Sequence, residues 1–195
     1  MSAKCYPLIE EFAVTSPYNV DGKKTYEGYS VRVHKGMDLD VIKDHSNVQI
    51  VSVTDGVVKR AQWQSGYGNY VWVANNDGTA CIYAHMEKIL VSVGQSVSPK
   101  TLLGYMGNTG HSYGKHLHFG VATNQDYSTV HSKNLWFNPA FYLGMQDYYN
   151  LKGRTFSGSG YVDGRSIGQT STNASESSST GTSYSTTTSS SSSLS

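Results

Sequence analysis

Residues 70–85 read YVWVANNDGTACIYAH. Two runs rich in β-branched and aromatic residues, 70–74 and 79–85, flank the polar segment 75–78, which ends in Asp-Gly. An Asp-Gly turn between two such runs is a strong hairpin signal, because glycine adopts the positive φ that tight turns require. Cys81 falls within the second run and is expected to be a buried, unreactive thiol. This stretch therefore predicts two antiparallel strands.

Other short β-type segments lie on both sides of this hairpin, separated by loops rich in glycine and asparagine. They cover residues 48–53, 56–59, 91–97, 102–106 and 116–121. No stretch sustains a helical period over three turns, and only residues 139–143 suggest a turn or two of helix. Short strands at this spacing are typical of an antiparallel sandwich or barrel. We therefore expect an all-β fold, one antiparallel β-sandwich or barrel-like domain with a groove, over residues 1–147.

The remaining residues, 148–195, are expected to form a Ser/Thr-rich linker or disordered tail. Within residues 170–195, 13 of the 26 positions are Ser and 7 are Thr. Such a segment has too little apolar surface to offset the entropy lost on ordering it. The folded part then has about 145–150 residues, which is enough for one hydrophobic core.

The charge balance and the apolar pattern exclude several classes of protein. Fifteen Lys and Arg against fourteen Asp and Glu give a net charge of +1, which disfavours a nucleic-acid binder held by phosphate contacts. The longest apolar runs have five residues, too few for a membrane-spanning helix. The two cysteines, Cys5 and Cys81, cannot form a disulfide scaffold or a four-thiolate zinc site. We expect a monomer.

The first candidate site is His34 and Asp38, with Gly36 between them. On an ideal strand these two side chains share a face but lie about 13 Å apart at ~3.3 Å per residue. One metal ion needs both ligand atoms at ~2.0–2.2 Å, so the chain must bend, and Gly36 is the residue that permits it. Imidazole and carboxylate suit zinc or another borderline divalent ion. A surface pair without a metal is the alternative interpretation.

The second candidate is the pair His116 and His118, which alternation places on one face while Leu117 and Phe119 turn toward a core. Two imidazoles about 6.6 Å apart on one strand are not explained by packing, although a polar pair on an exposed face is the alternative. They suit one direct ligand and one neighbour that reaches water at the metal. His85, at the end of the second hairpin strand, is a third candidate. Three protein ligands with an open fourth position are typical of catalytic zinc, whereas structural zinc is closed by four.

In this order the motifs resemble those of peptidase family M23, the lysostaphin-like peptidoglycan endopeptidases. The resemblance runs from about Thr15 to Leu143. The matching segments are His34-x-Gly36-x-Asp38, 55–58 (DGVV), 66–71 (GYGNYV), 77–78 (DG), 83–86 (YAHM), 93–97 (VGQSV), 104–110 (GYMGNTG), 116–119 (HLHF) and 136–139 (WFNP). This many motifs in one order are more specific than any one of them.

The resemblance implies a role for each matching histidine and for the aspartate. His34, Asp38 and His118 would be the zinc ligands, and His116 and His85 the catalytic histidines that bind no metal. His116 would accept a proton from water and pass it to the leaving amine, and His85 would donate to the developing oxyanion.

Other polar residues receive weaker assignments. Tyr26 or Tyr29, just upstream of the first motif, could offer a phenol to the oxyanion. His45, His111 and His131 lie in polar loop sequences and are expected to be solvated or to contact substrate at the rim of the groove. The chain contains no H-E-x-x-H motif, which excludes the helix-borne zinc proteases.

Three functions remain open. The first is a zinc-dependent endopeptidase that hydrolyses peptide cross-links of bacterial peptidoglycan. The second is a catalytically inactive binding or activator module of the same fold, although every expected ligand is present. The third is a β-domain that carries phosphate on histidine, which would not need the carboxylate of Asp38. Because the N-terminus lacks the apolar run of a secretory signal, we expect an enzyme that acts on the cell wall from outside after phage-mediated release or on a virion.

Overall fold

Antiparallel β-strands are the main secondary structure of the chain in the computed structural model, which describes residues 4–19, 25–26, 29–30, 33–146, 150–158 and 161–162. The strands are β1 (Lys4–Cys5), β2 (Phe12–Ser16), β3 (Thr25–Tyr26), β4 (Tyr29–Ser30), β5 (Met37–Val41), β6 (Gln49–Val51), β7 (Gly56–Gln64), β8 (Gly68–Asn75), β9 (Ala80–Ile89), β10 (Ser96–Val97), β11 (Leu102–Met106), β12 (Leu117–Ala122), β13 (Trp136–Phe137), β14 (Thr155–Phe156) and β15 (Tyr161–Val162). The helices are α1 (Tyr127–Lys133) and α2 (Pro139–Tyr142).

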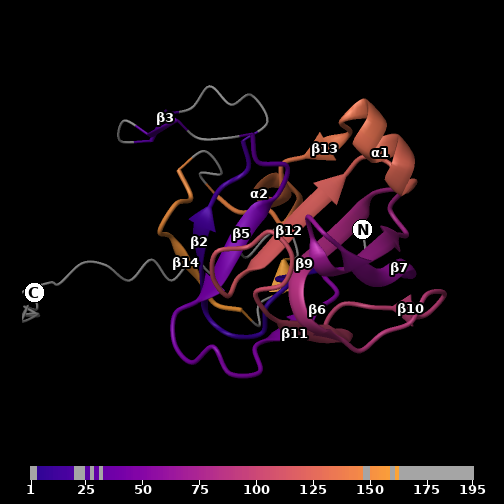
Figure 1. The fold of residues 1–195 in the computed structure, drawn as a ribbon, viewed down its shortest axis with the longest axis horizontal. Helices are drawn as coiled ribbons and strands as arrows, with labels where there is room; N and C mark the ends of the chain where they lie inside the picture. The colour runs from indigo at the N-terminus through magenta and orange to yellow at the C-terminus, as the bar shows by residue number, and fades with distance from the viewer. Residues whose placement is uncertain are drawn as a thin grey trace, which may run out of the picture.

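The predicted hairpin forms and lies in the main sheet. β8 and β9 pair antiparallel, with Ala74 opposite Ala80, and the Asn75 N–H donates to the Thr79 carbonyl across the turn. Gly78 has a φ of +86°, as the turn chemistry predicts. The sheet runs in the order β10-β7-β8-β9-β12-β5-β2-β14, with β11, β6 and β13 attached beside this path (Figure 1). All the pairs among the described strands are antiparallel, which confirms the predicted fold class.

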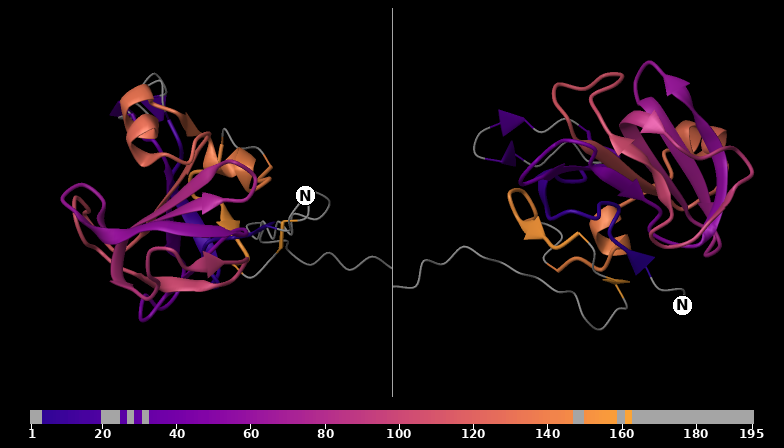
Figure 2. Two further views of the ribbon diagram at one scale, coloured as in Figure 1. Left: turned by 90° about the vertical axis from the view of Figure 1, so that its right-hand side faces the viewer. Right: turned by 90° about the horizontal axis from the view of Figure 1, so that it is seen from below.

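Alternation along β8, β9 and β12 divides the buried residues between two faces of the sheet. Val71, Tyr83 and Phe119 belong to a large core that also takes in side chains from both ends of the sheet, from β7 and β10 to β2 and β14. The sheet therefore curves around this core, as Figure 2 shows. Trp72 and Ile82 point to the opposite face, where a smaller apolar cluster includes residues of α1 and β13. The side of the sheet away from the large core is thus only partly covered.

The two helices agree only partly with the sequence analysis. α2 lies within the predicted residues 139–143 and begins with Asn138 as its N-cap. α1 was not expected, and it corrects the assignment of His131 to a loop. It has only seven residues and buries a single side chain, Val130, so it leaves no helical period to detect. Its one local signal is the N-cap Asp126, whose side chain accepts from the Thr129 N–H.

The packed part of the chain extends beyond the expected boundary at residue 147. β14 pairs with β2, and Leu151 and Phe156 are buried in the large core. The Phe156 ring stacks on Phe12 at 5.7 Å between centroids and meets Tyr6 edge-on at 5.8 Å. An isolated apolar residue in a polar stretch carries no periodic signal, so this contact depends on tertiary structure. The Ser/Thr-rich residues from 163 onward lie outside the described residues, and their disorder stays a prediction.

Replacing Phe156 with alanine is expected to lower the free energy of unfolding by about 3–5 kcal/mol, because it leaves a cavity between Phe12 and Tyr6. Removing residues 163–195 is expected to leave stability unchanged, because that segment has almost no apolar side chains to bury. Urea denaturation of both variants measures this difference. Equal stability of wild type and Phe156→Ala would show that the segment around Phe156 does not stabilise the domain.

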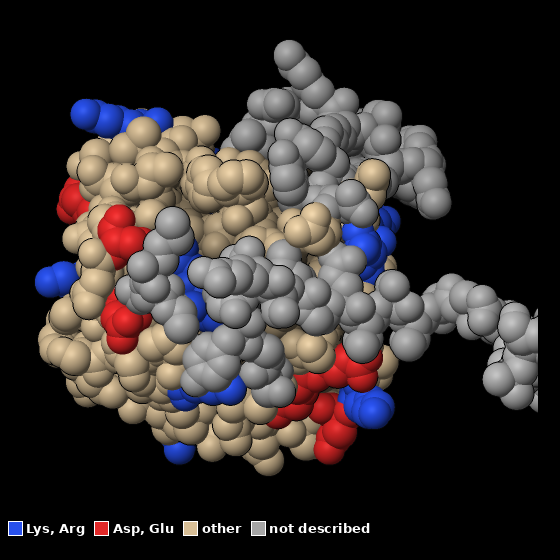
Figure 3. All heavy atoms as spheres, turned by 180° about the vertical axis from the view of Figure 1, so that it is seen from behind, with Lys and Arg blue, Asp and Glu red and all other residues tan. Residues whose placement is uncertain are grey.

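The surface agrees with the balanced composition. Figure 3 shows acidic and basic side chains in small mixed groups on the face seen from behind, with no continuous basic patch among the residues coloured there. Neither helix in the described part of the chain is long and apolar enough to cross a bilayer.

Candidate metal centre

The pairing of β5 with β12 brings Asp38 and His118 together. These residues lie directly opposite each other in the register, between the pairs Leu39 with Leu117 and Met37 with Phe119. Leu39 and Phe119 turn into the large core, so Asp38 and His118 both point to the opposite, less covered side. Residues 80 positions apart in sequence thus become cross-strand neighbours.

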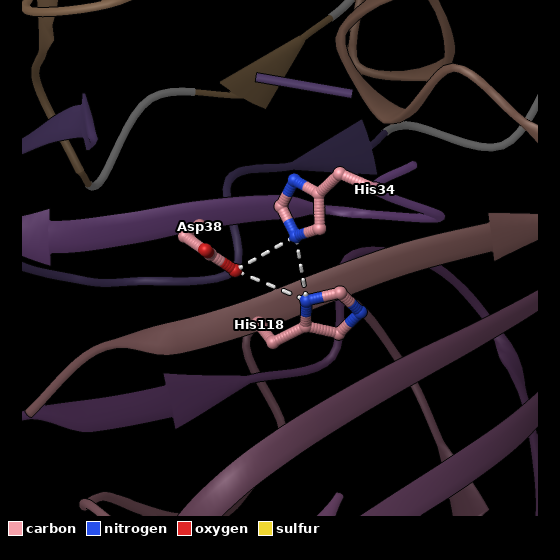
Figure 4. A group of neighbouring side chains, drawn as sticks. All are labelled: His34, Asp38 and His118. Carbon is pink, nitrogen blue, oxygen red and sulfur yellow. Dashed lines mark hydrogen bonds and ion pairs between the residues drawn. The ribbon is translucent and has the colours of Figure 1, made fainter. Parts of the chain in front are cut away.

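His34 completes a group of three, as Figure 4 shows. Its Nε2 lies 3.1 Å from Asp38 Oδ1 and 3.1 Å from His118 Nδ1, and His118 Nδ1 lies 3.0 Å from Asp38 Oδ1. His34 Nδ1 lies 3.0 Å from the Pro17 carbonyl, which only accepts, so this nitrogen carries the hydrogen. Nε2 of a neutral His34 therefore presents a lone pair to the carboxylate.

Such a group of electron-pair donors requires a cation between its members. A carboxylate and an unprotonated imidazole nitrogen 3.1 Å apart repel each other unless a proton or a metal ion lies between them. Three atoms bound to one tetrahedral zinc at ~2.0–2.2 Å are themselves about 3.3–3.6 Å apart, close to the spacing found here. The residues His34, Asp38 and His118 therefore fit a divalent metal ion.

The electrostatics of the group keep the Asp38 carboxylate ionised. Burial acts to raise the pKa of Asp38, but hydrogen bonds with His118 and His34 outweigh it and hold the pKa well below its usual range. Burial lowers the pKa of His118, and Asp38 opposes this only in part. Burial also acts to lower the pKa of His34, but Asp38 and the Pro17 carbonyl outweigh it and raise the pKa. The carboxylate stays ionised, which a metal ligand requires.

Gly36 contributes to the site in a way that differs from the expectation. The chain does bend at residues 35–36, as predicted. The φ of Gly36 is not in the left-handed region, so the bend itself does not demand glycine. A Cβ atom at residue 36 would instead lie 2.6 Å from Cε1 and Nε2 of His118 and 2.8 Å from the Phe119 carbonyl oxygen. The absence of a side chain at residue 36 leaves room for the His118 ring.

Gly36→Ala is therefore expected to displace the His118 ring and lower zinc affinity by about 10-fold or more. A competition titration with a chromogenic chelator measures the affinity without any substrate. Gly114→Ala is the matched control, because its added Cβ meets no atom within 4 Å and its φ is not in the left-handed region. Equal zinc affinity in Gly36→Ala and wild type would refute the close-approach argument.

His116 and His85 lie beside the three possible ligands, with their rings 4.8 Å apart. His116 Nε2 is 3.6 Å from Asp38 Oδ1, and its Nδ1 is 2.9 Å from the Gly114 carbonyl. His85 Nδ1 is 2.8 Å from the Thr109 carbonyl. Because a carbonyl only accepts, each Nδ1 carries the hydrogen, and each neutral ring has its lone pair on Nε2. Both rings are thus oriented by backbone groups.

His85 is held in a demanding conformation. Its φ is +61°, uncommon for a residue other than glycine, and its N–H donates to the Tyr67 carbonyl at 2.8 Å. Burial lowers the pKa of His85 to about 4, against the hydrogen bond to Thr109, so the ring is neutral at pH 7. A neutral ring with its hydrogen on Nδ1 can accept at Nε2 but cannot donate there. The expected role of His85 as an oxyanion donor does not fit this tautomer.

All five predicted site residues line one open groove of about 830 Å³. Its walls come from the turn at Gly66 and Tyr67 and from residues 111–115. His111 lies at the rim, in line with its predicted position, and the neighbouring Tyr113 is 91% exposed. The side chains of the remaining oxyanion candidates, Tyr26 and Tyr29, lie outside the described part of the structure.

Two other histidines differ from the sequence interpretation. His45 is not simply solvated, because its Nε2 lies 2.9 Å from Asp40 Oδ1. His131 is half-buried on α1, and its Nε2 lies 3.3 Å from the Tyr67 hydroxyl. The sequence analysis also missed the carbonyl groups that orient the site histidines, because backbone acceptors have no residue-type signal.

Comparison with known proteins gives a consistent result. The sequence profile described as Peptidase family M23 matches residues 32–130. An uncharacterized metalloprotease of Haemophilus influenzae is 34% identical over 120 residues, which are 61% of this chain and 24% of that protein. The peptidoglycan DD-endopeptidase ShyC of Vibrio cholerae is 29% identical over 94 residues, 48% of this chain and 21% of that protein. A solved zinc-containing peptidase from Vibrio cholerae is 29% identical, with a TM-score of 0.52 over 62% of this chain and 36% of that chain.

The similarity to the two curated relatives spans about a quarter of their length. Within this chain, the profile match covers half of the residues and contains His34, Asp38, His85, His116 and His118. The antiparallel fold, the grouped donors and the profile match agree, and the chain belongs to peptidase family M23.

Proposed function

We propose that this chain is a zinc-dependent endopeptidase that hydrolyses peptide cross-links of bacterial peptidoglycan. The observation that carries the proposal is the convergence of His34 Nε2, Asp38 Oδ1 and His118 Nδ1 within 3.0–3.1 Å, on the wall of an open groove. His34, Asp38 and His118 would hold the metal. Three protein ligands would leave one position for water, as in catalytic rather than structural zinc sites.

Zinc in this site supplies a Lewis acid that activates water and polarises a carbonyl group. Asp38 stays ionised, as a metal ligand must, and the Pro17 carbonyl fixes the tautomer of His34. His116 Nδ1 is held by the Gly114 carbonyl, and its Nε2 lies 3.6 Å from Asp38 Oδ1. It is placed to accept a proton from water and to return it to the leaving amine.

His85 acts beside His116 as a second acceptor. Because Nδ1 of His85 donates to the Thr109 carbonyl, its Nε2 carries the lone pair. The His85 ring lies 4.8 Å from that of His116. We propose that it accepts a hydrogen bond from the attacking water and so orients it toward His116. This role replaces oxyanion donation, which needs an N–H at the nitrogen that faces the groove.

The substrate class follows from the shape of the groove and from the relatives. An open groove of about 830 Å³ suits an extended peptide rather than a small enclosed ligand. One relative is named a peptidoglycan DD-endopeptidase, and we propose the same polymer, which lies outside the bacterial membrane, as the substrate here. We further propose that the chain acts as a monomer, because one chain supplies all five site residues.

Mass spectrometry of the fragments released from several bacterial walls tests the proposal. The zinc-loaded chain is expected to release muropeptides that have gained one water per bond cut, and the new termini identify the bond. A chelator should stop the release, and added zinc should restore it. Binding to these walls without release of any fragment would instead support the inactive module.

A further inference from the structure

Tyr67 lies in the turn between β7 and β8 and contacts three histidines. Its carbonyl oxygen accepts the His85 N–H at 2.8 Å. Its ring lies 5.8 Å from the His118 ring, at an interplanar angle of 37°. Its hydroxyl lies 3.3 Å from His131 Nε2. Tyr67, on the groove wall, thus connects His118 and His85 to α1.

The hydrogen bond between the Tyr67 hydroxyl and His131 Nε2 has a definite direction. His131 Nδ1 lies 2.7 Å from the Tyr127 carbonyl, which only accepts, so Nδ1 carries the hydrogen of the neutral ring. His131 Nε2 is then an acceptor, and the Tyr67 hydroxyl donates to it. The His131 ring is itself fixed, since it packs on Tyr127 at 4.0 Å and meets Trp136 edge-on at 5.2 Å. α1, which lies beside β13 in Figure 1, is therefore the anchor of Tyr67.

We propose that Tyr67 and His131 form a positioning pair that holds His118 and His85 in the geometry needed for zinc binding and catalysis. This inference rests on the proposed function and adds two residues to it. Gly36 lies so close to the His118 ring that an added Cβ would be 2.6 Å from it, and the Tyr67 ring is a second neighbour of His118, at 5.8 Å. Without the bond to His131, the Tyr67 ring can turn about its side-chain torsions, and the His118 ring loses that neighbour.

The hydrogen bond between Tyr67 and His131 also affects His85, through the backbone of Tyr67. The turn that carries Tyr67 supplies the acceptor for the N–H of His85, whose φ of +61° needs support from its surroundings. Fixing the Tyr67 side chain restricts this turn and keeps the carbonyl aimed at His85. Groups that orient metal ligands typically cost about 10- to 100-fold in metal affinity or activity when they are removed.

The test compares His131→Phe, Tyr67→Phe and the double variant in the full chain. Each single variant removes the hydrogen bond but keeps an aromatic ring. We expect each to lower zinc affinity about 10-fold in competition with a chelator, and to lower kcat about 10-fold with a smaller change in KM. The double variant should be no worse than either single one, because both remove the same bond. His131→Gln should restore much of the affinity, since its amide oxygen can accept from Tyr67.

Tyr142→Phe is the matched control. It removes a tyrosine hydroxyl that donates to Asp77 Oδ2 at 2.8 Å, outside the groove, so it should change thermal stability but not zinc affinity. The pair is overturned if His131→Phe binds zinc as wild type does, or if the two single effects add in the double variant. Zinc affinity is measured without substrate, so a wild type that binds zinc and cleaves no wall would refute the proposed function while the same titration still decides on the pair.

Discussion

His118→Ala is expected to lose both zinc and hydrolysis. Wild type should bind about one zinc ion per chain, as one set of three ligands implies. The alanine variant keeps only His34 and Asp38, and two ligands with no third at the same point hold the ion poorly. Elemental analysis after dialysis, paired with the rate of wall clearing, measures both losses.

His45→Ala is a suitable control for this variant. His45 also pairs with a carboxylate, Asp40, at 2.9 Å, but it does not belong to the group of three donors. It should retain zinc and activity, which separates loss of a ligand from loss of any His–Asp pair. Full zinc in His118→Ala would show that the metal does not bind at this group.

His116→Ala is expected to fail in a different way, although the residue lies only two positions from His118. It should keep its zinc and its fold but lose about 10²- to 10⁴-fold in kcat, because it supplies the proton acceptor rather than a ligand. His85→Ala should behave similarly, with zinc retained and kcat reduced more than substrate binding. Zinc stoichiometry and kcat of each variant are measured on the same preparation.

The pattern across the variants separates the possible assignments. Loss of metal in His116→Ala together with retention in His118→Ala would mean that the two roles are exchanged. Retention of both zinc and activity in His118→Ala, His116→Ala and His85→Ala would contradict the metallopeptidase proposal. Among His118→Ala, His116→Ala and His85→Ala, a variant that loses zinc but stays folded, by circular dichroism, assigns its histidine to the ligands.

Features that depend on residues close together in the sequence could be predicted from the sequence alone. The hairpin of residues 70–85 follows from turn chemistry between two β-type runs, and it forms as expected. The alternation that turns Leu117 and Phe119 inward leaves His118 on the other face, because the side-chain period of a strand is two. The bend at Gly36 could also be predicted, since one metal cannot reach two side chains about 13 Å apart.

Contacts between distant residues could not be predicted in this way. Gly36 leaves space for a ring that lies 82 positions further along the chain, and Phe156 stacks on Phe12 from a segment that was expected to be a tail. The tautomers of His85 and His116 are set by carbonyl groups of loops, which every residue type possesses. Local periodicity and turn signals arise from sequence neighbours, whereas the space around a ring and the partner of its second nitrogen arise from whatever the folded chain brings beside it.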